Sequence, residues 1–478
     1  MLSHKKSSLL LHSAFAASAV VATVSTAAAQ AVVPIRELSP VEAKSIAPIG
    51  AILGLRPLSG GRLLINDGLR RQLVVLDGNL TNAMVLVDSV AEGGQSYGPR
   101  PSPFIPYLAD STLFVDGTSL SLLVIDPTGK IAHVMSAPKP QDLRFLSGGQ
   151  SGVDAKGDLV YRGALVINAG RVGGPSQPGG AITPSIAPPD SSPIVRASFD
   201  TRQVDTLGAV KTQSGTRGQM AVDGNGKMQL KLTINPLQTV DEWAVLSDGT
   251  IAFVRGHDYH VDFIKPDGSK FSTEKLPFDW KRLTDEDKQG LIDSARTATE
   301  KSQADAKAAA GAGGRGGAEM AMVAGMAAMG GGGGMGGGGM SIQIHRDGGG
   351  GAGGNIAIGG GGPPGGMPNF QMGAPVIEFV PLKDIADYYP AIRQGAARAD
   401  LDGNLWILPT TSAQAKHGEL IYDVVNNKGV LFQRVRLPEG RSIAGFGHNG
   451  VVYLMYKDGT VGWMIERTRI LNNARATD

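Results

Sequence analysis

The chain has 478 residues, with 45 lysines and arginines against 43 aspartates and glutamates, and it contains no cysteine. Because clustered basic residues draw a protein to nucleic acid or to an anionic membrane surface, this balanced charge predicts neither partner. The lack of cysteine excludes disulfides, thiolate nucleophiles and thiolate metal sites, so stability must come from packing.

Residues 1–29 read as an export signal. Lys5 and Lys6 precede a short, alanine-rich apolar stretch that ends in small residues at Ala29. We expect cleavage near Ala29, which predicts a periplasmic or secreted bacterial protein. An uncleaved membrane anchor is the alternative, but the stretch is short for one, and no later segment approaches the ~20 apolar residues of a membrane span.

The rest of the chain reads as short strands separated by turns. The clearest unit is residues 241–268, DEWAVLSDGTIAFVRGHDYHVDFIKPDG, in which three runs rich in Val, Ile, Phe and Tyr are separated by Asp-Gly and Gly-His-Asp. Asp-Gly accepts a positive φ at little cost, and the flanking residues suit a half-buried pleated surface. One such meander cannot bury its own faces, so similar sheets are expected on either side.

Six meanders of this kind follow along the chain. Equivalent turns fall at Gly61, Ser111, Gly157, Gly249, Gly403 and Gly450. Where no insertion intervenes, their spacing is that of propeller blades, which predicts an all-β, six-bladed β-propeller with blades 1–4 in residues 30–280 and blades 5–6 in residues 375–478. The alternative is a seventh blade between Gly157 and Gly249, although the DGNG turn at residues 223–226 lies too close to Gly249 to anchor one.

Three further segments lie outside the meanders. AVVPIRELSP, residues 31–40, reads as an isolated strand that could close the propeller. GPRPSPFIP, residues 98–106, reads as a polar link. Residues 170–193 are too poor in large apolar side chains to be core.

The insertion between the fourth and fifth meanders, residues 281–374, has two parts. Thr284 followed by Asp287 resembles a capping box, and the sequence after it has helical propensity with a thin apolar stripe, which predicts a solvated helix. Residues 311–366 then hold 27 glycines in 56 residues. Such a segment cannot bury enough apolar area to offset its ordering entropy, so it is predicted to be disordered.

Residues 241–268 and 398–406 (RADLDGNLW) resemble the bacterial exported six-bladed β-propeller proteins of the NHL and TolB-like group. The resemblance covers most of residues 32–280 and 375–470. It implies that the innermost strands line a channel, that ligands bind at one mouth, and that a terminal strand joins the last blade to the first. Some relatives are lactonases or lyases with a channel metal held by acidic and Asn residues. Calcium is therefore the cofactor to test, although the sequence requires none.

Two arginines occupy the same point of successive meanders. VYRG at residues 160–163 and FVRG at residues 253–256 each end a strand with Arg-Gly. Equivalent blade positions point the same way about the axis, so Arg162 and Arg255 are predicted at one rim, where two planar forks of donors suit a carboxylate, a sulfate or a sugar acid. The alternative is that each arginine pairs with a neighbouring acid or caps a hairpin.

His257, Asp258 and Arg398 complete the candidate ligand-binding residues. His257 and Asp258 form, with His260 and Asp262, a local group of side chains able to bind metals. Strand alternation separates the four, and a solvated strand edge is the simpler interpretation, because a catalytic zinc site needs three converging ligands. We assign no catalytic residue and no metal ligand.

Several aspartates stand immediately before a glycine. They are Asp248, Asp267, Asp402 and Asp458. Asp side chains in this position commonly hydrogen-bond the backbone of their own turn. We therefore interpret them as turn residues rather than as carboxylates for acid–base chemistry.

These observations predict a propeller that binds a small polar or anionic ligand, or a protein partner, at one mouth of its channel. The alternative is a propeller hydrolase or lyase of the lactonase kind that acts on a small polar substrate. Convergent acids on the channel strands, with a strongly perturbed pKa among them, would favour the enzyme. Arginines that face one mouth without such acids would favour binding.

Deleting residues 311–366 should leave the melting temperature nearly unchanged, because a glycine-rich segment contributes little burial. Thermal unfolding of the full chain and the deletion variant, followed by circular dichroism, checks this. A large loss of stability would show that the segment packs against the remainder.

Overall fold

A computed structural model describes most of the chain. The described residues are 33–89, 97–98, 101–117, 119–146, 150–163, 185–186, 190–212, 216–222, 228–312, 376–413, 419–459 and 462–474. Their strands and helices belong to one compact unit, Pro34–Asp478. The predicted export signal lies outside the described residues, as does nearly all of the glycine-rich segment.

Within the described residues, four sheets are meanders of four antiparallel strands. Sheet 1 holds β3 (Ile52–Pro57), β4 (Leu63–Asp67), β5 (Gln72–Leu76) and β6 (Ala83–Val87). Sheet 2 holds β7 (Phe104–Pro106), β8 (Thr112–Asp116), β9 (Ser121–Ile125) and β10 (Ile131–Ser136). Sheet 3 holds β11 (Ser151–Val153), β12 (Leu159–Arg162), β14 (Ser191–Ala197) and β15 (Val204–Lys211). Sheet 4 holds β18 (Glu242–Val245), β19 (Ile251–Arg255), β20 (His260–Ile264) and β21 (Lys270–Ser272).

The C-terminal strands form two further meanders inside one nine-stranded sheet. The first contains β23 (Ala397–Ala399), β24 (Leu405–Ile407), β25 (Leu420–Val425) and β26 (Leu431–Leu437). The second contains β27 (Ser442–Phe446), β28 (Val451–Asp458) and β29 (Gly462–Ala474). The N-terminal strand β1 (Ile35–Leu38) joins them, because it pairs parallel to β26 and antiparallel to β29.

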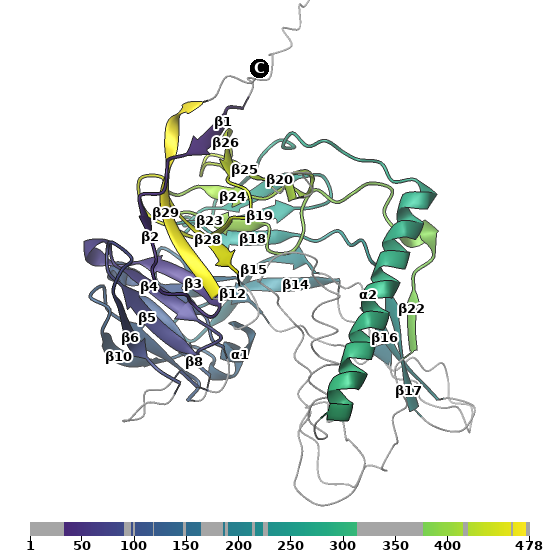
Figure 1. Cartoon of the computed structure of the whole chain (residues 1–478), viewed down its shortest axis with the longest axis horizontal. Helices are drawn as coiled ribbons and strands as arrows, with labels where there is room; N and C mark the ends of the chain where they lie inside the picture. The colour runs from purple at the N-terminus through teal and green to yellow at the C-terminus, as the bar shows by residue number, and fades with distance from the viewer. Residues whose placement is uncertain are drawn as a thin grey trace, which may run out of the picture. The chain divides into compact units, whose positions relative to one another are not determined.

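The N-terminal segment continues along the edge of β29. The short strand β2 (Ala43–Lys44) pairs with β29, and the purple N-terminal strands run beside the yellow β29 in Figure 1. Backbone N–H groups of Glu42, Ser45 and Ile49 donate to carbonyl groups of β29 at 2.8 Å each. The run expected to close the propeller therefore pairs with the last strand of the chain.

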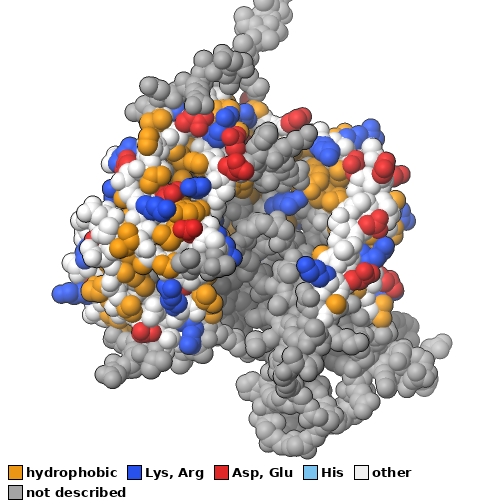
Figure 2. Space-filling view, viewed as in Figure 1, with side chains coloured by type: hydrophobic (Ala, Val, Ile, Leu, Met, Phe, Trp, Pro, Cys, Tyr) orange, Lys and Arg blue, Asp and Glu red, His pale blue; other side chains and the backbone are white. Residues whose placement is uncertain are grey.

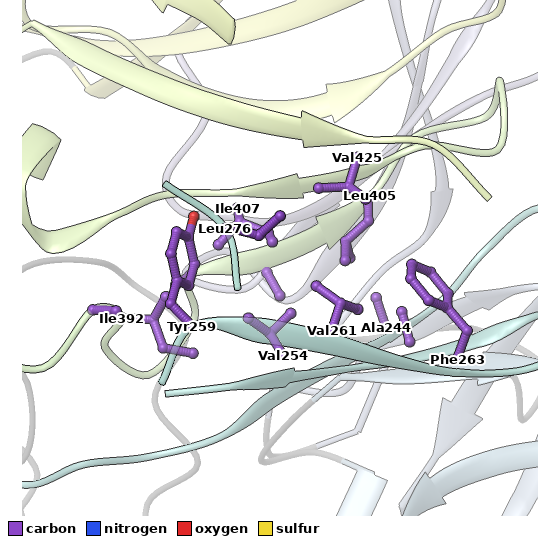
Figure 3. Close-up of a cluster of buried hydrophobic side chains, with 14 of the residues drawn as sticks. Ala244, Val254, Tyr259, Val261, Phe263, Leu276, Ile392, Leu405, Ile407 and Val425 are labelled. Carbon is purple, nitrogen blue, oxygen red and sulfur yellow. The ribbon is translucent and has the colours of Figure 1, made fainter. Parts of the chain in front are cut away.

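Apolar side chains bind each sheet to the next. Strand alternation turns successive residues to opposite faces, so Val160 of β12 faces sheet 4 while its neighbour Tyr161 faces sheet 2. Within the described residues, five buried clusters each join two meanders that follow one another along the chain. A sixth joins the last meander to sheet 1. The chain is thus all-β with a propeller-like arrangement of sheets. Figure 3 shows the cluster between β18–β21 and β23–β25.

The turns follow the chemistry expected from the sequence. In the β18–β19 turn, the Asp248 carboxylate accepts a hydrogen bond from the N–H of Thr250 at 2.9 Å. Gly249 has a φ of 82°, and a Cβ atom there would collide with the backbone of Ala155 in sheet 3. Glycine thus serves both the turn and the close approach of two sheets. Asp402 differs, because it caps Asn449 and Gly450 of the next meander.

A second, smaller assembly lies apart from the meanders. It consists of helix α2 (Asp285–Ala312) and a sheet with the strand order β13-β16-β17-β22. These strands are β13 (Ser185–Ile186), β16 (Thr216–Val222), β17 (Met228–Ile234) and β22 (Val376–Phe379). The interval considered for a seventh blade therefore contributes β13, β16 and β17 to this separate sheet. The interval does not form a seventh blade by itself, because the fourth strand of this sheet is β22, which follows the insertion in the chain.

Helix α2 begins as predicted but is not simply solvated. Thr284 Oγ1 accepts from the N–H of Asp287 at 3.1 Å, and the N–H of Thr284 donates to the Asp287 carboxylate at 2.9 Å. Ile292 is only 5% exposed and packs with Leu237 and Ile385. The prediction of a solvated helix is therefore wrong for the face that carries Ile292, because the thin apolar stripe there packs against Leu237 and Ile385.

Another correction concerns the segment read as a polar link, residues 98–106. It contains β7, the first strand of sheet 2, which pairs with β8 through Ile105 and Leu113. Prolines at each end of the segment made it look like a link rather than a strand. Because β7 lacks a second partner strand among the described residues, the N–H donors that proline lacks are not needed there.

On the face shown in Figure 2, positive and negative side chains are interspersed, in keeping with the balanced charge.

Removing residues 33–49 should destabilise the fold strongly. The change exposes the backbone edge of β29 and removes buried Ile49, and we expect it to cost more than about 3 kcal/mol of the free energy of unfolding. Urea unfolding of chains that begin at Val33 and at Gly50 measures this difference. Light scattering should also show self-association through the uncovered edge. Equal stability of the two chains would show that closure by this segment is dispensable.

Candidate functional site

The first strands of several sheets begin at a common end of the fold. Glu242 opens β18, and its carboxylate contacts the N–H of Gly395, two residues before β23. The side chain of Gln150, immediately before β11, donates to the carbonyl of Ala397, which opens β23. These contacts place the starts of β11, β18 and β23 together. We call this region the Glu242 end.

Glu242 is a buried acid at this end. Its side chain lies on the face of β18 opposite Trp243, and the residue is only 4% exposed. One oxygen accepts the hydrogen bond from Gly395 at 3.1 Å, and Gly395 has a φ of 79°. Burial raises the pKa of Glu242 to about 7, which the Gly395 N–H and the Arg162 charge partly oppose. The carboxyl can thus gain or lose a proton near neutral pH.

Arg162 is near enough to this acid for its charge to act on it. Its Nε is buried and has no hydrogen-bond acceptor within the part of the chain that the structure describes. Burial lowers the pKa of Arg162, while the charge of Glu242 raises it. None of the ion pairs between described residues joins Arg162 to Glu242. The Nε–H of Arg162 therefore leaves hydrogen-bonding capacity unused among the described residues.

Arg255 lies near the start of β18, where it contacts Asp241, but its donors are occupied. Its Nε contacts the Asp262 carboxylate at 2.7 Å, and its Nη1 contacts Asp241 at 3.0 Å. Nη1 also donates to the carbonyl of Ala209 in sheet 3 at 2.8 Å. The structure thus gives Arg255 the neighbouring acids that the sequence left open as an alternative, whereas no ion pair between described residues involves Arg162.

His257 and Asp258 lie in the hairpin that follows Arg255. His257 is exposed, and Asp258 contacts Nδ1 of His260 at 2.7 Å. The other ring nitrogen of His260 lies 3.2 Å from the Asp262 carboxylate. These groups extend the network of Arg255 along sheet 4. Among the described residues, no group of three His, Asp or Glu side chains is arranged to hold a metal ion, calcium included.

Arg398 serves a neighbouring contact. It lies in the middle of β23 and donates from Nη1 to the carbonyl of Ile443 in β27 at 2.9 Å. The guanidinium therefore ties the first strands of the last two meanders together. Of the five candidate residues, Arg162 is the one whose charge acts on Glu242.

Glu242 is not among the candidate residues predicted from the sequence. A sign was available, because an acid directly before Trp243 opens a strand that otherwise carries apolar residues. The residues that bury it lie elsewhere in the chain, however, so its raised pKa has no local sequence pattern.

No helix within the described ranges is long and apolar enough to cross a bilayer.

Comparison with models of protein families finds no match, and comparison with curated proteins finds none either. Among solved structures, the chain is similar to an inactive virginiamycin B lyase from Staphylococcus aureus with quinupristin, with 9% identity, a TM-score of 0.34, and 89% of this chain and 97% of that one covered. It is also similar to a PQQ-bound aldose sugar dehydrogenase from Streptomyces coelicolor, with 11% identity, a TM-score of 0.33, and coverage of 92% and 100%. A putative gluconolactonase matches with 13% identity, a TM-score of 0.23, and coverage of 51% and 85%. Likeness at this level says nothing about the chemistry of the Glu242 end.

The stability of the protein should fall as Glu242 ionises. Its pKa is about 7 in the folded state against 4.5 for an ordinary glutamate, so the folded state holds the proton more tightly. The favourable contribution is complete below pH 4.5 and is lost as the pH rises to 7, by about 3 kcal/mol. Urea unfolding of the wild type and Glu242→Gln at pH 5 and pH 8 isolates this change. Parallel pH profiles for the two proteins would contradict it.

Proposed function

We propose that the chain is a six-bladed β-propeller that binds a small polar ligand at the Glu242 end. The observation that carries the proposal is the buried Nε of Arg162, which has no acceptor among the described residues, together with the buried carboxyl of Glu242, on which the Arg162 charge acts. Buried polar groups are normally hydrogen-bonded, so a buried donor without an acceptor suggests a partner outside the described residues. A bound ligand is such a partner.

The blade count is supported by the clusters between sheets. Sheets 1–4 supply four blades, and the meanders β23–β26 and β27–β29 supply two more, fused by β1 into one hydrogen-bonded sheet. The cluster that joins β28 and β29 to β3–β5 closes the series, since it brings Ile465 against Ile65. A propeller closed by strands from both ends of its chain has this arrangement.

The ligand chemistry follows from the two side chains. A guanidinium offers a planar fork of donors that suits a carboxylate or another oxyanion. Glu242 can donate when protonated and accept when ionised. A small anionic or polyhydroxylated molecule therefore fits better than an apolar one, and a protein partner would need to present such a group on a narrow projection.

A second candidate is a hydrolase or lyase acting on a small polar substrate. The specific observation in its favour is the pKa of Glu242 near 7, because general acids and bases work best when their pKa lies near the operating pH. Arg162 would then stabilise charge that develops on a substrate oxygen. Turnover that disappears in Glu242→Gln while ligand binding persists would favour this enzyme.

We also propose that the protein acts outside the cytoplasm. The support is the N-terminal sequence, with its lysines, its alanine-rich apolar stretch and the small residues that end at Ala29. Fractionation of a bacterial culture, with N-terminal sequencing of the mature protein, tests this proposal. Intact Met1 in a cytoplasmic fraction would reject it.

Small acids should raise the melting temperature of the wild-type protein, because a ligand that binds the folded state stabilises it by mass action. A thermal-shift screen with sugar acids, lactones, neutral sugars and calcium measures this. Arg162→Gln should abolish the shift. The matched control is Arg202→Gln, since Arg202 lies in the β14–β15 hairpin, at the opposite end of sheet 3. A shift that survives in Arg162→Gln would move the site elsewhere.

A further inference from the structure

The assembly of helix α2 and its sheet contains a groove, built from other elements than the Glu242 end. One wall is a face of α2, and the other is residues 377–382, in strand β22 and just after it. The two walls run alongside each other in Figure 1, and the groove has a volume of about 740 Å³. We propose that this groove binds an extended peptide of a partner protein, which adds to β22 as a further strand.

The groove follows the edge of β22 rather than one of its faces. Side chains of a strand alternate between the two faces, so a groove against one face would touch every second residue. Here each residue in turn from Ile377 to Leu382 lines the groove. An occupant of the groove therefore lies along the edge of the strand, with α2 on its other side.

The backbone of β22 presents hydrogen-bonding groups to this edge. The N–H of Val380 donates to the carbonyl of Ile234 in β17 at 3.0 Å, so Val380 and Glu378 turn their N–H and C=O groups to β17. The same groups of Ile377 and Phe379 point to the opposite edge. In the part of the chain that the structure describes, β17 is the one strand that pairs with β22. Two donors and two acceptors thus lie where an added strand would pair.

The length and the apolar floor of the groove suit a short peptide. Its helical wall runs from Gln289 to Glu300, a distance of ~16 Å along the helix axis, which matches about five residues of extended chain. Ile292 on α2 and Phe379 on β22 belong to one apolar cluster. A peptide with apolar side chains at alternate positions would extend this cluster while its backbone pairs with β22.

The charges of the groove favour a basic peptide over an acidic one. Arg296 on the helical wall contacts Asp293 at 3.1 Å, and Glu378 on the strand contacts Lys231 at 2.8 Å. Glu300 adds a further exposed carboxylate to the helical wall. The charged residues that line the groove, with their ion-pair partners, are therefore three acids and two bases. A lysine next to the apolar positions of the peptide is attracted here, and a glutamate is repelled.

The test uses the full chain and three fluorescein-labelled heptapeptides. In the first, valine alternates with lysine; in the second, valine alternates with glutamate; the third is the first with proline at its central valine. Fluorescence anisotropy measures their binding. We expect the lysine peptide to bind, the glutamate peptide to bind at least roughly tenfold more weakly, and the proline peptide not to bind, because proline disrupts the added strand.

Two substitutions locate the binding in the groove. Gln289→Trp fills the groove from an exposed position of α2, and Ile377→Pro removes one N–H from the open edge of β22 while its pairing with β17 is kept. Each should weaken binding of the lysine peptide by roughly tenfold or more. The matched controls are Ser294→Trp, on the opposite side of α2, and Ile377→Val, which keeps the N–H. Both controls should bind as the wild type does.

Hydrogen exchange gives a second readout that needs no variant. The N–H groups of Ile377 and Phe379 should become protected when the lysine peptide is added to the wild type. This measurement still reports the result should Ile377→Pro lose the small sheet.

Several outcomes would overturn the proposal. They are no binding of the lysine peptide up to millimolar concentration, binding that survives in Gln289→Trp, no added protection at Ile377 and Phe379, and equal or tighter binding of the glutamate peptide. A dimer in analytical ultracentrifugation that Ile377→Pro dissociates would assign the groove to a second copy of the chain and would also overturn it. Since the two sites share no residue, none of these outcomes bears on the ligand of the Glu242 end.

Discussion

Closure of the last sheet by the N-terminal segment is the constraint on which this fold depends. A four-stranded meander buries neither of its faces alone, so each sheet needs a neighbour on both sides, and a row of sheets is satisfied only when its ends meet. Here the ends meet through β1, β2 and Ile49 along the edge of β29, and through the cluster that places Ile465 against Ile65. The same contact removes the exposed strand edge that would favour aggregation.

The closed arrangement also explains where polar chemistry is concentrated. Much of each sheet is committed to apolar contacts with its neighbours, and the charged groups of the candidate site lie where strands begin or end. Arg162, Arg255 and Glu242 stand at such ends, where three first strands begin close together. Arg255 is satisfied by two acids, Asp241 and Asp262. Arg162 has a buried Nε with no acceptor among the described residues, and Glu242 has a pKa raised by burial, which makes this end the functional candidate.

The assembly of helix α2 and its sheet has a hydrophobic core separate from those between the meanders. Its helix packs on residues near β22 through a small core of its own, with Ile292 and Ile385 at its centre, and Lys288 reaches the Asp387 carboxylate at 2.6 Å. Because this core is separate from the six clusters between meanders, the long insertion is accommodated without disturbing the blades around it. A solvated helix would have needed no such partner.

The sequence alone determined the features that depend on neighbours in the chain. The Asp248-Gly249 turn, the Thr284–Asp287 cap and the strand pattern of the meanders follow from local φ preferences, short-range hydrogen bonds and alternation, and each was predicted. The tertiary structure decided the rest. Whether a Pro-flanked run becomes β7, whether Arg255 finds Asp241 and Asp262, and whether Glu242 is desolvated beside Arg162 depend on which distant segments pack together. Burial and pairing at those positions belong to the assembled sheets, and no stretch of sequence contains them.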